Sequence, residues 1–206
     1  MSNPLWNPGH QLVLASKSAA RRALLESAGL PFETDAADID ERDIEAAFIE
    51  GGGEVENLAA ALARAKALRV SERRPGALCL GADQVLALAG QMLHKPATIE
   101  DAAAQLMKLS GRAHRLISAF AIARDGRMIT HDEDIAVMTM RRLDGAQIAI
   151  YLRAAGHAAL SSVGGYQIEG LGAHLFERVE GDHTTIMGLP MFKLLARLRE
   201  MGAVSL

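Results

Sequence analysis

A short segment near the start of the chain carries residue types that bind oxyanions. Ser16 and Ser18 stand between a predicted strand and a predicted helix, and Lys17, Arg21 and Arg22 follow closely. A helix N-terminus presents free backbone N–H groups and the positive end of the helix dipole, so these side chains can form a phosphate cradle there. The glycines of a Walker loop are absent. The alternative is an ordinary serine cap beside solvated basic residues.

Three charged residues further along are candidates for the same site. Lys66 continues the apolar face of Leu58 and Leu62 at four-residue spacing, so it points inward, either to the edge of the core or to an anionic ligand. Asp83 is predicted to end a buried central strand, where it could hold a metal, orient a water or serve as a turn residue. Lys95 follows in a predicted loop, close enough in sequence to share the site, or else lies on the surface.

A glycine-rich segment, residues 164–172, surrounds Glu169. Glycines allow a backbone to approach a ligand closely, although such a segment can also be a plain loop. The seven histidines lack the spacing of a zinc site, and no Gly-x-Ser-x-Gly or Gly-x-Gly-x-x-Gly pattern is present. A histidine zinc site, a serine hydrolase and a dinucleotide enzyme therefore have no support.

The composition predicts a folded protein of the cytoplasm. The chain has 206 residues, of which half are hydrophobic, and a net charge of -3, which gives no basic footprint for nucleic acid. The single cysteine, Cys79, excludes an internal disulfide framework and lies in an apolar run that predicts a buried, inert thiol. No apolar stretch reaches the roughly 18 residues of a membrane span, and no secretory signal is visible. We expect neither a nucleic acid nor a membrane as partner.

The elements that must position these residues alternate between strand and helix. Strands are predicted over residues 11–15, 77–82, 85–88, 115–123, 127–140 and 174–179. Helices are predicted over residues 18–28, 56–73, 98–109, 144–154 and 190–202. Because hairpins such as the one at Asp125-Gly126 occur beside crossovers, the expected class is α/β (mixed α+β) with a mixed sheet.

The order of short segments along the chain is more specific than any one of them. They are Leu14-Ala15-Ser16-x-Ser18 with Arg21-Arg22, Asp40-Glu41, Ala65-Lys66-Ala67, Gly81-Ala82-Asp83, Lys95-Pro96, Leu109-Ser110-Gly111 with His114, Glu169-Gly170-x-Gly172-Ala173, and Glu180-Gly181-Asp182 before Gly188-Leu189-Pro190. In this order the sequence resembles the Maf family of nucleoside triphosphate pyrophosphatases, from residue 12 to residue 202.

The resemblance implies a single domain over residues 1–206, with two lobes around a central cleft and a long curved mixed sheet of the Maf/inosine-triphosphatase-like fold. It implies hydrolysis of a nucleoside triphosphate to the monophosphate and pyrophosphate with a divalent cation, usually Mg²⁺ or Mn²⁺, and the family often forms homodimers. The residue matching Asp83 is the family's proton acceptor. The phosphate side of the cleft would hold Ser16, Ser18, Arg21, Lys66 and Lys95, and the metal ligands would be Glu41 and Asp83.

Three positions that tune base preference in the family fall on Ala20, Gln84 and Glu169. Gln84 and Glu169 match the subgroup that acts on 7-methyl-GTP. Ala20 matches neither that subgroup, which has tryptophan there, nor the members that act on dTTP and UTP. The resemblance thus favours a 7-methyl-GTP-like substrate. A dTTP/UTP-type pyrophosphatase and a non-catalytic nucleotide-binding regulator of septum formation and cell division are the alternatives.

Overall fold

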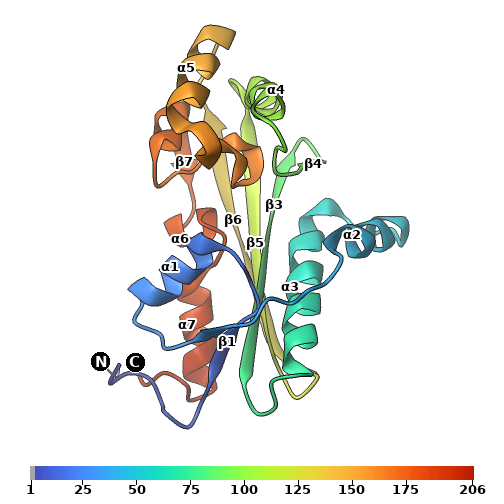
Figure 1. Ribbon diagram of the computed structural model, residues 1–206, viewed down its shortest axis with the longest axis vertical. Coiled ribbons are helices and arrows are strands. Elements are labelled where there is room, and N and C mark those ends of the chain that lie inside the picture. The colour runs from blue at the N-terminus through green and yellow to red at the C-terminus, as the bar shows by residue number, and fades with distance from the viewer. Residues whose placement is uncertain (1–2) are drawn as a thin grey trace. The chain divides into compact units, whose positions relative to one another are not determined.

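The computed structural model describes residues 3–206, and within them the chain forms one mixed seven-stranded sheet with helices packed on it (Figure 1). The strand order is β2-β1-β3-β5-β6-β7, and β4 pairs with β3. The strands are β1 (Leu12–Leu14), β2 (Glu33–Thr34), β3 (Leu78–Leu88), β4 (Gln91–Leu93), β5 (Ala113–Arg124), β6 (Arg127–Met140) and β7 (Phe176–Glu180). The β1–β2 and β1–β3 pairs are parallel, whereas β3–β4 and β6–β7 are antiparallel, so the predicted class is confirmed.

The helices follow the predicted order along the chain, with additions. The α-helices are α1 (Ala19–Ser27), α2 (Glu41–Glu50), α3 (Val55–Ser71), α4 (Ile99–Leu109), α5 (Gly145–Ala155), α6 (His183–Ile186) and α7 (Met191–Glu200). Three short 3₁₀ helices are η1 (Gly156–Leu160), η2 (Val163–Gly165) and η3 (Leu171–Leu175). No described helix is long and apolar enough to cross a membrane.

The chain divides into two compact units. The first contains the residues up to Gln84 together with residues 118–134 and 188–206, and the second contains residues 85–117 and 135–187. Strands β3, β5 and β6 each run from one unit into the other.

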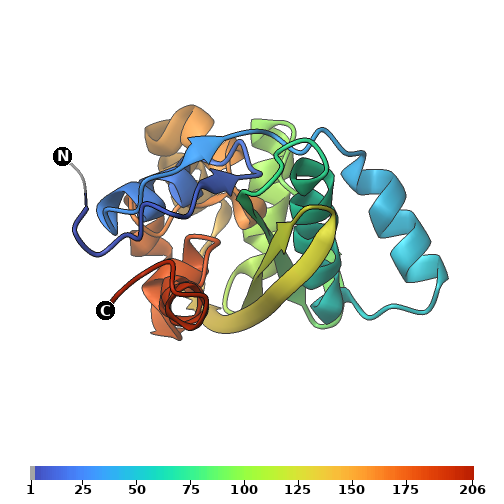
Figure 2. The ribbon, with the colours of Figure 1, turned by 90° about the horizontal axis from the view of Figure 1, so that it is seen from below.

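In the first unit, helix α3 lies beside β3, and helices α1 and α7 lie on the other side of the strands (Figures 1 and 2). Gly81 permits the close approach of α3. A Cβ at this position would lie 2.1 Å from the carbonyl oxygen of Ala63 and 2.5 Å from the backbone nitrogen of Ala67. The face of α3 turned to the strand includes Leu58 and Lys66, both buried, as their spacing predicted.

In the second unit, the core lies among α4, α5 and the 3₁₀ helices, with Leu106, Leu116 and Met138 among its buried side chains. A polar pair is buried in it, because Nε2 of His114 lies 2.6 Å from the hydroxyl of Tyr166. Burial lowers the pKa of His114 to about 4, so the ring is neutral.

Most local signals in the sequence are confirmed. Ser18 caps α1, Thr98 and Asp101 form the capping box of α4, and Asp125-Gly126 make the β5–β6 turn with positive φ angles of 51° and 73°. Cys79 is buried, and this burial raises the pKa of its thiol to about 11.

One expectation was wrong, and one helix was not predicted. The separate strands predicted over 77–82 and 85–88 are one strand, β3, so Asp83 lies inside a strand and not at its end. The apolar pattern is interrupted by Asp83 and Gln84 because each has a polar partner there, not because the strand stops. Helix α2 was not predicted, since it has no buried residue and therefore no apolar face to detect.

Candidate functional site

Arg21 is a buried cation of the first unit, and its guanidinium makes three hydrogen bonds. It is only 8% exposed, and its Nε donates to the carbonyl oxygen of Gly188 at 2.9 Å. Its Nη1 donates to the carbonyl oxygen of Ala82 at 2.7 Å and to Oγ of Ser16 at 3.2 Å. Nη2 has no hydrogen-bond partner among residues 3–206. The guanidinium is therefore fixed on one side, and its other side can receive an anion.

Strand β1 explains why Arg21 can reach Ala82. The pairing of β1 with β3 ends at Leu14, and the last ladder bond runs from the Ala15 nitrogen to the Leu80 carbonyl. Two residues further along β3, the carbonyl oxygen of Ala82 accepts a hydrogen bond from the guanidinium of Arg21 instead. Arg21 thus occupies the place that a longer β1 would have filled. Burial lowers the pKa of Arg21, and the nearby Asp83 and Glu41 oppose this effect.

The two predicted phosphate-binding serines have defined roles in the turn before α1. Oγ of Ser16 accepts from the backbone nitrogen of Ser18 as well as from Arg21. Oγ of Ser18 accepts from the backbone nitrogen of Arg21 and caps the helix. Both serines thus lie with Arg21 at the N-terminus of α1, as predicted.

Lys66 brings together the two predicted metal ligands. Its ammonium lies 2.5 Å from Oδ1 of Asp83 and 2.9 Å from Oε1 of Glu41. Lys66 and Asp83 are buried, whereas the side chain of Glu41 is 54% exposed. Glu41 is the first residue of α2, which Asp40 caps, so this helix begins at the site.

The side chain of Gln84 points to the face of β3 opposite to that of Asp83, because successive side chains of a strand point to opposite faces. Its Nε2 donates to Oγ of Ser118 on β5 at 2.9 Å. Ala20, the second residue of α1, is half-buried and offers only a methyl group. The first unit therefore places two of the three predicted specificity residues on the elements that carry Arg21 and Asp83.

The other two predicted residues belong to the second unit. Lys95 is exposed in the loop between β4 and α4. Glu169 is exposed in the part of the glycine-rich segment that lies between η2 and η3. That segment is anchored by buried side chains: the hydroxyl of Tyr151 donates to the carbonyl oxygen of Gly165, and His114 bonds Tyr166.

Residues 11–201 match the Maf-like protein family. The chain belongs to the Maf family. It is 52% identical over 189 residues to a 7-methyl-GTP pyrophosphatase of Brucella abortus, covering 92% of this chain and 95% of the relative. It is 51% identical to a 7-methyl-GTP pyrophosphatase of Mesorhizobium japonicum, covering 94% and 98% of the two chains. It is 52% identical to a nucleoside triphosphate pyrophosphatase of Rhodopseudomonas palustris, covering 95% and 96%. The resemblance expected from the short segments is confirmed.

Asp83 and Glu41 are the carboxylates of this Maf protein that could take part in holding a divalent cation. Within residues 3–206, no group of three or more His, Cys, Asp or Glu side chains is placed to hold a metal. Asp83 and Glu41 both contact the ammonium of Lys66, so two carboxylates lie close to the same side chain. Mg²⁺ is commonly held by one or two carboxylates, with substrate phosphates and water as the remaining ligands. Asp83 and Glu41 are therefore the residues that would hold it.

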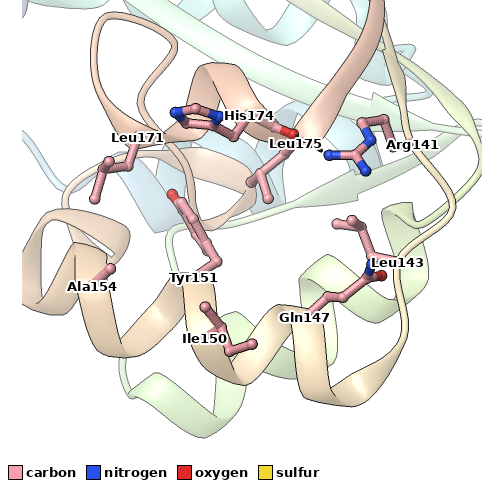
Figure 3. A pocket seen from close by; sticks show the side chains of 9 residues that line it. All are labelled: Arg141, Leu143, Gln147, Ile150, Tyr151, Ala154, Leu171, His174 and Leu175. Atoms are coloured by element: carbon pink, nitrogen blue, oxygen red, sulfur yellow. Dashed lines mark hydrogen bonds between the residues drawn. The ribbon is translucent and has the colours of Figure 1, made fainter.

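A pocket of about 290 Å³ lies elsewhere, in the second unit (Figure 3). In the view, Tyr151 and Ile150 of α5 face Leu171 and Leu175 of η3, and Arg141 lies at one end. None of the residues predicted for the Maf site lines this pocket. Its wall includes Tyr151, whose hydroxyl anchors the glycine-rich segment.

Sequence reasoning missed two residues of the site in this Maf protein. Gly188, with a φ of 98°, presents the carbonyl that accepts from Arg21, and its motif had been noted without a role. Ser118 lies among apolar residues of a buried strand, and nothing in the sequence marks it as a partner of Gln84.

Proposed function

We propose that this chain is a divalent-cation-dependent nucleoside triphosphate pyrophosphatase whose preferred substrate is a modified guanine nucleotide such as 7-methyl-GTP. The observation that carries the proposal is the fixed guanidinium of Arg21, which has one unpaired side among the described residues and lies at the strand edge next to Asp83. A triphosphate brings about four negative charges, and a site for it needs cations held in place before it arrives.

The residues have distinct parts in the proposed reaction. Arg21, Lys66 and the N-terminus of α1 would hold the phosphates, and Lys95 would add a further cation. Asp83 would accept the proton of the water that attacks the α-phosphorus, releasing the monophosphate and pyrophosphate. A bound Mg²⁺ or Mn²⁺ would supply charge neutralisation and a lower pKa for its water. Buried against Lys66, Asp83 has a fixed direction, which favours proton transfer at a defined position.

The choice of base rests on Gln84 and Glu169. An amide can pair with the edge of a purine, and a carboxylate favours a cationic, methylated base. Ala20 offers no aromatic ring for cation–π stacking, so the preference for 7-methyl-GTP over GTP is expected to be shallow. Two relatives at about 52% and 51% identity are named 7-methyl-GTP pyrophosphatases, which supports this substrate. We also propose, from the composition, that the enzyme works in the cytoplasm.

The test is pyrophosphate release from 7-methyl-GTP, GTP, UTP and dTTP, with Mg²⁺, with Mn²⁺ and with EDTA. We expect release only with a divalent cation, and the highest kcat/KM with 7-methyl-GTP. A preference for UTP or dTTP would overturn the proposed substrate but not the proposed class of reaction. Nucleotide binding without any release would favour the non-catalytic regulator.

A further inference from the structure

The amide of Gln84 is held from one side by a buried hydroxyl. Its Nε2 donates to Oγ of Ser118 at 2.9 Å, and Ser118 is fully buried on β5. Gln84 itself is only half-buried, so the rest of its side chain borders the site. Because Ser118 has no exposed surface, its position is set by the packing of β5, and its hydrogen bond restrains the amide of Gln84.

The other end of the same amide lies near Gly188, which also borders Arg21. A Cβ built on Gly188 would be 3.7 Å from Oε1 of Gln84, 3.5 Å from Nε of Arg21 and 3.6 Å from its Nη2. The backbone of Gly188 is thus adjacent to both side chains, and its carbonyl also fixes Arg21. Nε2 of the amide faces Ser118, and Oε1 lies toward Gly188.

We propose that Ser118 is a specificity-determining residue of this enzyme, because it positions the amide of Gln84 for recognition of the base. The hydrogen bond to Ser118 restrains the place of the Gln84 amide. A base that pairs with the amide in that place meets a poorly aligned partner when the amide is displaced. Ser118 does not touch the reacting atoms and acts through Gln84. The inference rests on the proposed function, and within it on the role of Gln84.

Replacement of Ser118 by alanine tests this directly. The variant removes the oxygen that accepts from Nε2 of Gln84. We expect the ratio of kcat/KM for 7-methyl-GTP to that for UTP to fall by about 3- to 10-fold, the scale of one hydrogen bond. Ser118→Thr keeps a hydroxyl at the same position, so the ratio should return to within about 2-fold of wild type.

A double-mutant cycle separates positioning from packing. If Ser118 acts through Gln84, then Ser118→Ala changes the ratio in the wild-type background but not in the Gln84→Ala background. Thermal unfolding of each variant shows that it is folded, and Ser118→Cys, which is close in size and offers only a weak acceptor, carries the test if the alanine variant does not fold. An unchanged ratio in Ser118→Ala, or an equal change in both backgrounds, would overturn the role of Ser118.

Failure of the proposed function gives a different result. If wild type releases pyrophosphate from none of the nucleotides, the reaction is wrong, and the same ratio is then measured as dissociation constants for 7-methyl-GTP and UTP. A shift of that ratio in Ser118→Ala alone would keep the positioning role. If wild type binds neither nucleotide, the reaction and the role of Ser118 are both overturned.

Discussion

The ammonium of Lys66 lies 2.5 Å from Oδ1 of Asp83, and it also contacts Glu41. One cation therefore balances two carboxylates that come from different elements, a strand and the first turn of α2. Without it, two anions would face each other and one of them would be buried without its ion-pair partner. Such loss is costly, since removing one member of a buried pair typically costs about 3–5 kcal/mol.

Lys66→Met should therefore lower the free energy of unfolding by about 2–4 kcal/mol, measured by urea denaturation at neutral pH. The estimate is below the full range because Glu41 is exposed and can turn to water. Glu41→Gln is the matched control, and its cost should be under about 1 kcal/mol. Equal costs in the two variants would show that burial of the pair does not matter.

Asp83→Asn keeps the size of the side chain and removes its charge and basicity. Turnover should fall about 10²-fold or more, the scale of general base catalysis, in a pyrophosphate release assay. Asp132→Asn serves as control, because Asp132 is also a paired carboxylate of the first unit but is bonded to Arg197 on α7. Near-normal turnover in Asp83→Asn, or an equal loss in Asp132→Asn, would contradict the catalytic role.

Arg21→Lys keeps the charge but loses the planar fork that makes three fixed bonds. We expect kcat/KM to fall about 10- to 100-fold for every nucleoside triphosphate, with little change in base preference. The neighbouring Arg22 is exposed, so Arg22→Lys should leave kcat/KM within about 2-fold. A change of base preference without loss of overall activity would place Arg21 at the base instead.

Sequence reasoning predicted the elements that have a periodic apolar face or a local cap. Helix α4 was predicted from its capping box, and the inward direction of Lys66 followed from a four-residue spacing. Helix α2 could not be predicted in this way, because it has no buried residue. The contact of Ser118 with Gln84 could not be predicted for a different reason. The two residues are 34 positions apart, and only the pairing of strands brings them together.

Gly81→Ala tests the close packing of α3 on β3. The new Cβ would overlap the backbone of α3, so the helix must shift, and we expect a loss of about 1–3 kcal/mol or more in unfolding free energy. Because Lys66 is on that helix, turnover should fall as well. Gly145, at the start of α5, has nothing within 4 Å of a built Cβ, and Gly145→Ala should be neutral in both measurements. Unaltered stability in Gly81→Ala would refute this packing.

His114→Gln should make the protein less sensitive to acid. The pKa of His114 is lowered to about 4 by burial, whereas an unfolded chain binds this proton near pH 6.5. The stability due to this neutral ring is complete above pH 6.5 and is lost as the pH falls toward 4. Between pH 7.5 and 4.5, wild type should lose about 2–3 kcal/mol more than the variant in urea unfolding. Parallel pH profiles of the two proteins would rule out His114 as the titrating group.

The burial of Cys79 has a practical consequence for measurements in solution. It is the only cysteine of the chain, and with a pKa near 11 its thiol is almost entirely protonated at neutral pH. Alkylating reagents attack thiolates, so the native protein should remain unlabelled. A cysteine introduced on the surface would then be the single reactive thiol. Two such cysteines, one in each unit, would allow spin labels or fluorophores to report the distance between the units with and without a nucleotide, without removal of the native cysteine.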